Sequence, residues 1–99
     1  MVAVIAPDAI VRASSHQVSN RVGEEVAILE LDQGCYYGLE PVGAFVWRHL
    51  EAPISVSKLH EAVVTEYEVD PQVARRDLLA LLEEMHAAGL IEVAGGSSD

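Results

Sequence analysis

The clearest pattern along the chain is an alternation of side chains over residues 25–31. Ala27, Leu29 and Leu31 fall on one face, and Val26, Ile28 and Glu30 fall on the other. A period of two residues is typical of a β-strand with one better-buried face. Asp32-Gln33-Gly34 follows and favours a turn, because glycine adopts positive φ without strain. Residues 35–39 return as the next strand, so the pattern predicts a hairpin.

The segment before this hairpin is predicted to contribute one more strand. Residues 10–14 mix β-branched and small side chains, whereas residues 15–20 are polar. Ser14, Ser15, His16 and Ser19 would suit a catalytic cluster by residue type, but neighbouring polar residues of this kind are typical of a turn. We therefore predict a three-stranded antiparallel meander from residues 10–14, 25–31 and 35–39.

Three helices are predicted after the sheet. Pro41 ends the last strand because it has no N–H to donate, and residues 42–50 follow as a helix that buries Trp47 in the core. Ser55 is an N-cap for a second helix, Val56–Tyr67. A third helix starts at Asp70-Pro71 and runs to residue 88, where Gly89 ends it. Residues 90–93 are predicted to be a short extended piece that docks on the core.

The third predicted helix carries more apolar surface than one core contact needs. At about 100° per residue, its apolar side chains spread over roughly 160°; they are Leu78, Leu79, Leu81, Leu82 and Met85. One flank aligns Arg75, Leu79, Leu82 and His86, and the other brings Ala74, Leu81 and Ala88 beside Asp77. Either the domain itself packs on two sides of this helix, or part of the arc forms the floor of a groove. The pattern leaves open which flank faces such a groove.

Strands followed by helices indicate an α+β domain, and this order resembles a winged helix-turn-helix. We divide the chain into a loose N-terminal arm at residues 1–9, one domain at 10–93 and a flexible tail at 94–99. Winged helices often bind DNA, but 16 acidic residues outnumber 6 Lys and Arg and give a net charge of −10 at pH 7. The third helix sets Arg75 and Arg76 against Asp77, Glu83 and Glu84, which would repel DNA phosphates.

Composition limits the chemistry further. Cys35 is the only cysteine, which excludes an internal disulfide and a multi-cysteine metal site, and the 4 histidines are scattered without metal-ligand spacing. Beside tyrosines on a strand, Cys35 is predicted to be a small apolar filler rather than a nucleophile. We therefore expect no catalytic residue, metal or cofactor. No segment resembles an export signal or a membrane span, so we expect a cytoplasmic protein.

A series of motifs resembles a known family. These motifs are Gly-Cys-Tyr-Tyr-Gly-Leu-Glu-Pro-Val-Gly at residues 34–43, the pair Val46-Trp47, the helix at 55–67 and the closing Gly89-Leu90-Ile91. In this order and spacing, the chain resembles the PqqD-like proteins, also called RiPP recognition elements, over about residues 10–91. It is most similar to the small stand-alone members of lasso-peptide gene clusters. Many members have asparagine where this chain has Glu40, which is a poorer helix cap.

The resemblance implies a non-catalytic module that binds the leader of a ribosomally made precursor peptide. The leader is expected to add as a strand to the outer edge of residues 35–39 and to pack on the third helix. The expected peptide contacts are Cys35, Tyr36, Tyr37, Gly38, Arg75, Leu78, Leu79, Leu82, Glu83, Met85 and His86. Gly38 allows close backbone approach, and the leucines with Met85 form an apolar floor. Arg75 is a candidate anchor for a leader carboxylate, and Glu83 for a leader basic group.

The resemblance also implies partners. A cysteine protease that removes the leader and an ATP-dependent lasso cyclase are the expected ones, and neither nucleic acid nor membrane is expected. Two alternatives remain open: a PqqD-like peptide chaperone for a radical SAM enzyme, and a DNA-binding winged helix, which the acidic charge disfavours.

Overall fold

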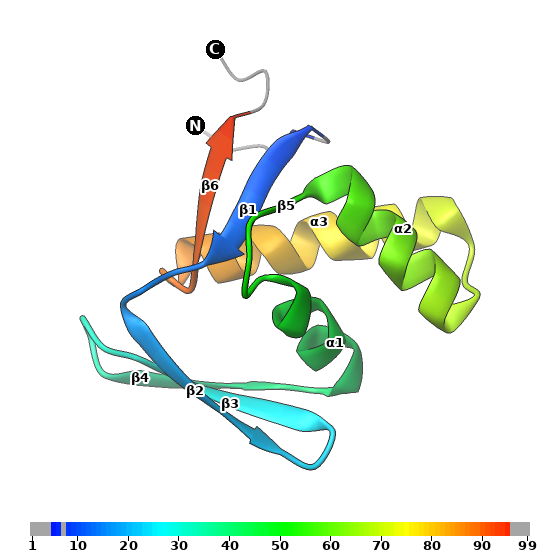
Figure 1. Ribbon diagram of the computed structural model, residues 1–99. Coiled ribbons are helices and arrows are strands. Elements are labelled where there is room, and N and C mark those ends of the chain that lie inside the picture. Colours follow the sequence, from blue (N-terminus) through cyan, green and yellow to red (C-terminus); the bar gives the residue numbers. More distant parts are fainter. Residues whose placement is uncertain (1–4, 7, 96–99) are drawn as a thin grey trace.

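The computed structural model describes residues 5, 6 and 8–95, and it has the predicted mixed α+β architecture (Figure 1). Along the chain the elements are β1 (Ala9–Ala13), β2 (Gln17–Val22), β3 (Glu25–Glu30), β4 (Cys35–Leu39), α1 (Pro41–His49), β5 (Ile54–Ser55), α2 (Val56–Tyr67), α3 (Pro71–Ala87) and β6 (Ile91–Gly95). A three-stranded antiparallel sheet and three helices are both present, as predicted. Helix α2 has the predicted bounds, and α1 and α3 differ from theirs by a residue.

The antiparallel meander is formed by β2, β3 and β4, in that order. The prediction was wrong about its first strand: residues 17–22, expected to form a turn, pair with β3 from Gln17–Glu30 to Val22–Glu25. The strand is exposed along most of its length, so it has no apolar face for a sequence pattern to reveal. Gly23, at φ +64°, makes the tight turn that joins it to β3.

The strand predicted at residues 10–14 belongs instead to a second sheet. In that sheet β1 lies between β5 and β6 and pairs with β6 from Ala9–Gly95 to Ala13–Ile91. Its partners come from the far end of the chain, which local patterns do not indicate. In Figure 1 this small sheet lies above α1, whereas the meander lies below it.

Both predicted chain ends meet this second sheet. Residues 1–4 and 7 of the predicted arm lie outside the described part of the chain, but Ile5 is buried in the core and Ala9 begins β1. At the other end β6 continues to Gly95, two residues into the predicted tail, and residues 96–99 are not described.

The helix ends follow from their capping residues. The Ser55 hydroxyl accepts a hydrogen bond from the Lys58 N–H, and the Asp70 carboxylate accepts from the N–H groups of Gln72 and Val73. Glu40 makes no side-chain cap bond, as expected of a poor cap, and α1 begins instead with Pro41 at its first position. Gly89, at φ +79°, ends α3 and lets the chain turn into β6.

The core is built around one ridge of α3 and the inner faces of both sheets. The α3 ridge consists of Leu78, Leu82 and Met85, all buried. Trp47 is 5% exposed, which confirms its predicted place in the core. Helix α2 packs against α3, with Arg75 and Leu79 on the flank beside it.

Candidate functional site

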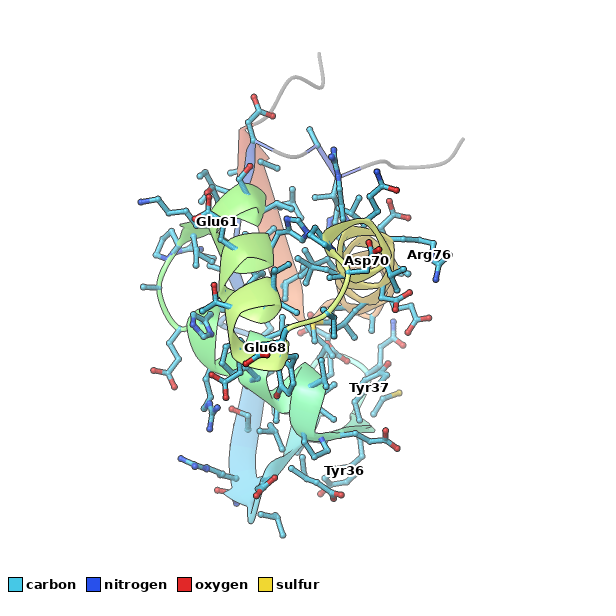
Figure 2. All side chains as sticks on the ribbon, turned by 90° about the vertical axis from the view of Figure 1, so that its right-hand side faces the viewer. Tyr36, Tyr37, Glu61, Glu68, Asp70 and Arg76 are labelled. Atoms are coloured by element: carbon cyan, nitrogen blue, oxygen red, sulfur yellow. The ribbon has the colours of Figure 1, made fainter. Side chains whose placement is uncertain are left out.

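Strand β4 is an open edge of the meander. It pairs with β3 along Cys35–Leu39, and among the described residues no strand pairs with its other side. On such an edge, every other residue directs its backbone N–H and C=O away from the sheet. Figure 2 shows Tyr37 on the side of the strand toward α3 and Tyr36 on the opposite side, where it is largely exposed.

A groove runs between this edge and α3. The part of it beside Tyr37 and the last turns of α3 is a cavity of about 190 Å³ lined by Tyr37, Gly38, Leu39, Leu81, Glu84, Met85, Ala88 and Leu90. Beside it, a cavity of about 560 Å³ is lined by residues 38–43 together with Asp77, Leu81 and Glu84. The early turns of α3 therefore face the end of β4, and its later turns face Tyr37. The helix and the strand therefore flank the same groove, and Figure 1 shows that they run in opposite directions.

The groove ends in an apolar pocket among the three helices. This pocket has a volume of about 250 Å³ and is lined by Val42, Val46, Val63, Tyr67, Val69, Val73, Ala74, Asp77, Leu78 and Leu81. It shares Val42, Asp77 and Leu81 with the neighbouring cavity, so the groove and the pocket are continuous. Three exposed valines, Val42, Val69 and Val73, line it. The pocket can therefore accept an apolar side chain without a large rearrangement.

The structure brings some of the predicted contact residues together at this groove. Tyr37, Gly38 and Met85 line it directly, and Leu78 lies in the wall of the end pocket. Cys35 and Tyr36 belong to the β4 edge but do not line the cavities. Cys35 is a free, half-buried thiol.

The remaining predicted contacts lie elsewhere. Arg75 and Leu79 line a separate cavity on the opposite flank of α3, against Val56, His60 and Glu61 of α2. Leu82 is 0% exposed and belongs to the core. Glu83 and His86 are on α3 but do not line the groove. Because α2 covers the Arg75 and Leu79 flank, the flank that faces β4 is the one that carries Asp77, Leu81, Glu84 and Ala88.

Several residues that line the groove were not among the predicted contacts, notably Leu81, Glu84 and Leu39. Asp77, Leu81, Glu84 and Ala88 recur at intervals of three and four residues, which is the signal of one helix face. The same signal is present on the opposite flank, at Arg75, Leu79, Leu82 and His86. Only the position of α2, a tertiary feature, distinguishes the two.

The groove is acidic and contains a protonated phenol. Glu40, Asp77 and Glu84 all line its larger cavity, and no Lys or Arg in the described part of the chain lines the groove or its end pocket. Partial burial, followed by the neighbouring Cys35 and Glu30, raises the pKa of the Tyr37 hydroxyl above its ordinary value. A tyrosine is already protonated at neutral pH, and this shift favours the protonated, hydrogen-bond-donating form further.

A buried carboxylate holds the turn that leads into β4. Glu30 is 4% exposed, and its two oxygens accept the N–H groups of Asp32 at 3.0 Å and Gln33 at 2.9 Å. Its backbone oxygen accepts the Gly34 N–H at 2.9 Å. These bonds satisfy turn donors that would otherwise lack partners, so the start of β4 is fixed in place before any ligand arrives.

The described residues offer no further site of a recognisable chemical kind. Among them, no group of three His, Cys, Asp or Glu side chains is placed to hold a metal ion. In the same part of the chain, each helix is too short or too polar to cross a membrane.

Comparison with known proteins places this fold. The family model of coenzyme PQQ synthesis protein D (PqqD) matches residues 25–91. The chain belongs to the PqqD family. The match covers β3, β4, all three helices and the first residue of β6, so it includes every element of the groove. No curated protein sequence matches the chain significantly.

Two solved structures resemble this PqqD-family chain along most of its length. One is TbiB1 in complex with the TbiA(beta) leader peptide: it is 33% identical, with a TM-score of 0.78, and the match covers 89% of this chain and 99% of that chain. The other is lasso peptide synthetase B1 complexed with the leader peptide, at 22% identity and a TM-score of 0.73, covering 83% of this chain and 96% of that one. At 22% identity the lasso peptide synthetase B1 structure shows a shared fold. At 33% identity over most of both chains, TbiB1 is also related to this chain in sequence.

Proposed function

We propose that this protein binds the leader of a ribosomally made precursor peptide, of the lasso-peptide class, as an added strand on β4. The observation that carries the proposal is the open edge of β4 beside an apolar groove wall on α3. TbiB1, at 33% identity, was solved with a leader peptide, which supports a ligand of this class.

Binding would combine two kinds of contact. Backbone bonds to the β4 edge would supply affinity without regard to sequence, and Gly38, whose Cβ position is open, lets a peptide backbone approach closely. Side chains of the peptide that face α3 would pack on Leu39 and Leu81, and an apolar one would fill the end pocket. These side-chain contacts would select one leader among others.

The protein would act without catalysis of its own, in the cytoplasm. It would present the bound leader to a cysteine protease that removes it and to a lasso cyclase, because strand addition leaves the outer face of the peptide accessible. A role as peptide chaperone for a radical SAM enzyme is the second candidate, favoured by the match to PqqD itself. The lasso class is preferred because the motifs at residues 34–43 and 89–91 resemble those of the stand-alone members of lasso-peptide gene clusters.

The two flanks of α3 provide a matched test. Leu81 and Leu79 are both half-buried, but only Leu81 faces β4. Leu81→Glu is expected to weaken leader binding about 30- to 100-fold, from lost apolar contact and an added buried charge. Leu79→Glu is expected to change it less than about threefold. Titration calorimetry with the leader encoded beside this gene, and with the TbiA(beta) leader, measures both.

Thermal unfolding of each variant must first show that it is folded. If neither leader binds the unaltered protein, the proposed function is wrong. If Leu79→Glu weakens binding as strongly as Leu81→Glu, then a leader does bind but the groove has been assigned to the wrong flank.

A further inference from the structure

The α3 wall of the groove has a regular order of charged and apolar side chains. Asp77, Leu81 and Glu84 all line the larger cavity, so they face the same space beside β4. With a rise of 1.5 Å per residue, Leu81 lies about 6 Å along the helix from Asp77, and Glu84 about 4.5 Å further. Side chains on one face of a strand repeat every 7 Å or so. Successive inward side chains of an added strand would therefore meet acid, leucine and acid in turn.

The two acids have little basic compensation within the described residues. Asp77 forms an ion pair with Arg76 at 3.4 Å, and the two side chains are 69% and 75% exposed. Arg76 projects outward from α3 in Figure 2, away from the body of the protein. Glu40 adds a third carboxylate at the end of β4. A peptide lying in the groove would experience negative potential from both walls.

We propose that this protein selects leaders that carry Lys or Arg at two strand positions facing α3, four residues apart, with an apolar residue midway between them. The inference rests on the proposed function, because the open edge of β4, and not the carboxylates, is what makes an extended peptide the ligand. The strand spacing between the two basic positions exceeds the helix spacing by about 3 Å, a difference that flexible Lys and Arg stems can absorb. The binding should weaken as salt is added, since these charges remain partly exposed.

A charge scan tests the inference. The TbiA(beta) leader is synthesised as two sets, with each position replaced in turn by Lys and by Glu, and the dissociation constant of every peptide for this protein is measured by fluorescence anisotropy. Lys is expected to bind about three- to tenfold more tightly than Glu at two positions four apart, and to show little preference at the positions between them. An apolar residue should be preferred over either charge at the central position.

A neighbouring pair of glutamates supplies the matched control. Glu84→Lys is expected to reverse the preference, so that Glu is favoured at one of the two positions. Glu83→Lys makes the same change in net charge one residue away, outside the groove, and is expected to retain the preference for Lys.

The outcomes separate the inference from the proposed function. The charge pattern is wrong, and leader binding is left intact, if peptides bind without any preference for Lys over Glu. The same holds if the positions that prefer Lys are not four residues apart. An equal response to Glu83→Lys and Glu84→Lys would also overturn it, because only overall charge would then matter. If neither the scan nor the leader encoded beside the gene yields binding, the proposed function fails and this inference fails with it.

Discussion

The two sheets of the molecule are built from different kinds of strand pairing. Strand β1 pairs with β5 and β6, so it joins residues near the start of the chain to residues near its end, as in the contact of Arg12 with Glu92, 80 positions away. The meander β2-β3-β4 pairs consecutive segments through two short turns. In both sheets the central strand, β1 or β3, has partners on both edges. Among the described residues, the outer strand β4 of the meander keeps one edge free beside the α3 groove.

We infer that the first sheet mainly stabilises the fold, whereas the meander provides the edge on which a ligand can bind. Val11 at the centre of β1 is 0% exposed, so the first sheet closes the core. The inner face of the meander also contributes Val26 and Ile28 to the core, but its outer face carries the well-exposed Val18 and Tyr36, and its strands pair through short local turns. A sheet that is held together locally can leave an edge open for a ligand, because its own pairing does not depend on that edge. The comparison predicts that equal substitutions in the two sheets have unequal effects.

The largest difference is expected for valine truncation. Val11→Ala removes buried methyl groups from β1 and is expected to lower the free energy of unfolding by about 2 kcal/mol. Val18→Ala makes the same change on β2, where the side chain is 55% exposed, and should cost less than about 0.5 kcal/mol. Urea unfolding followed by circular dichroism measures both. Equal losses would contradict the division of roles between the sheets.

The same division explains what the sequence was able to predict. The β3-β4 hairpin was found because Val26 and Ile28 alternate with exposed positions and a glycine turn follows, all within a few residues. The α2 and α3 starts were found because Ser55 and Asp70 cap them locally. Strand β1 was recognised as a strand but assigned to the wrong sheet, because its partners in β6 lie at the other end of the chain.

The site was also predicted only as far as local sequence patterns reach. The edge strand followed from the hairpin, so Tyr37 and Gly38 were correctly placed beside α3. Which flank of α3 they face depends on where α2 packs. The spacing of residues along α3 does not indicate this, because it is similar on both flanks. Arg75 and Leu79 were therefore expected as peptide contacts but lie against α2, whereas the groove is lined by Leu81, which had been placed on the alternative flank, and by Glu84.

A smaller effect is expected where the meander does contain a buried polar anchor. Glu30→Gln keeps the side-chain shape but replaces one accepting oxygen by an NH₂ group, so one of the N–H groups of Asp32 and Gln33 loses its partner. The expected cost is about 1–2 kcal/mol in the free energy of unfolding. Glu25→Gln, exposed at the other end of β3, is the control and should stay within about 0.5 kcal/mol. Hydrogen exchange of the Asp32 and Gln33 amides should accelerate in Glu30→Gln alone; unchanged exchange would show that the carboxylate does not hold this turn.

The smallest effect is expected from the most visible polar contact in the first sheet. The Arg12 guanidinium donates to a Glu92 carboxylate oxygen from Nη2 at 2.8 Å and from Nε at 3.0 Å, between residues directly opposite each other on β1 and β6. The two side chains are 57% and 44% exposed, so water and salt weaken their attraction. A double-mutant cycle with Arg12→Ala and Glu92→Ala is expected to give a coupling energy of about 0.2–1 kcal/mol, falling toward zero in 1 M salt. A coupling above about 2 kcal/mol would mean that the first sheet depends on this pair and not on the burial of Val11.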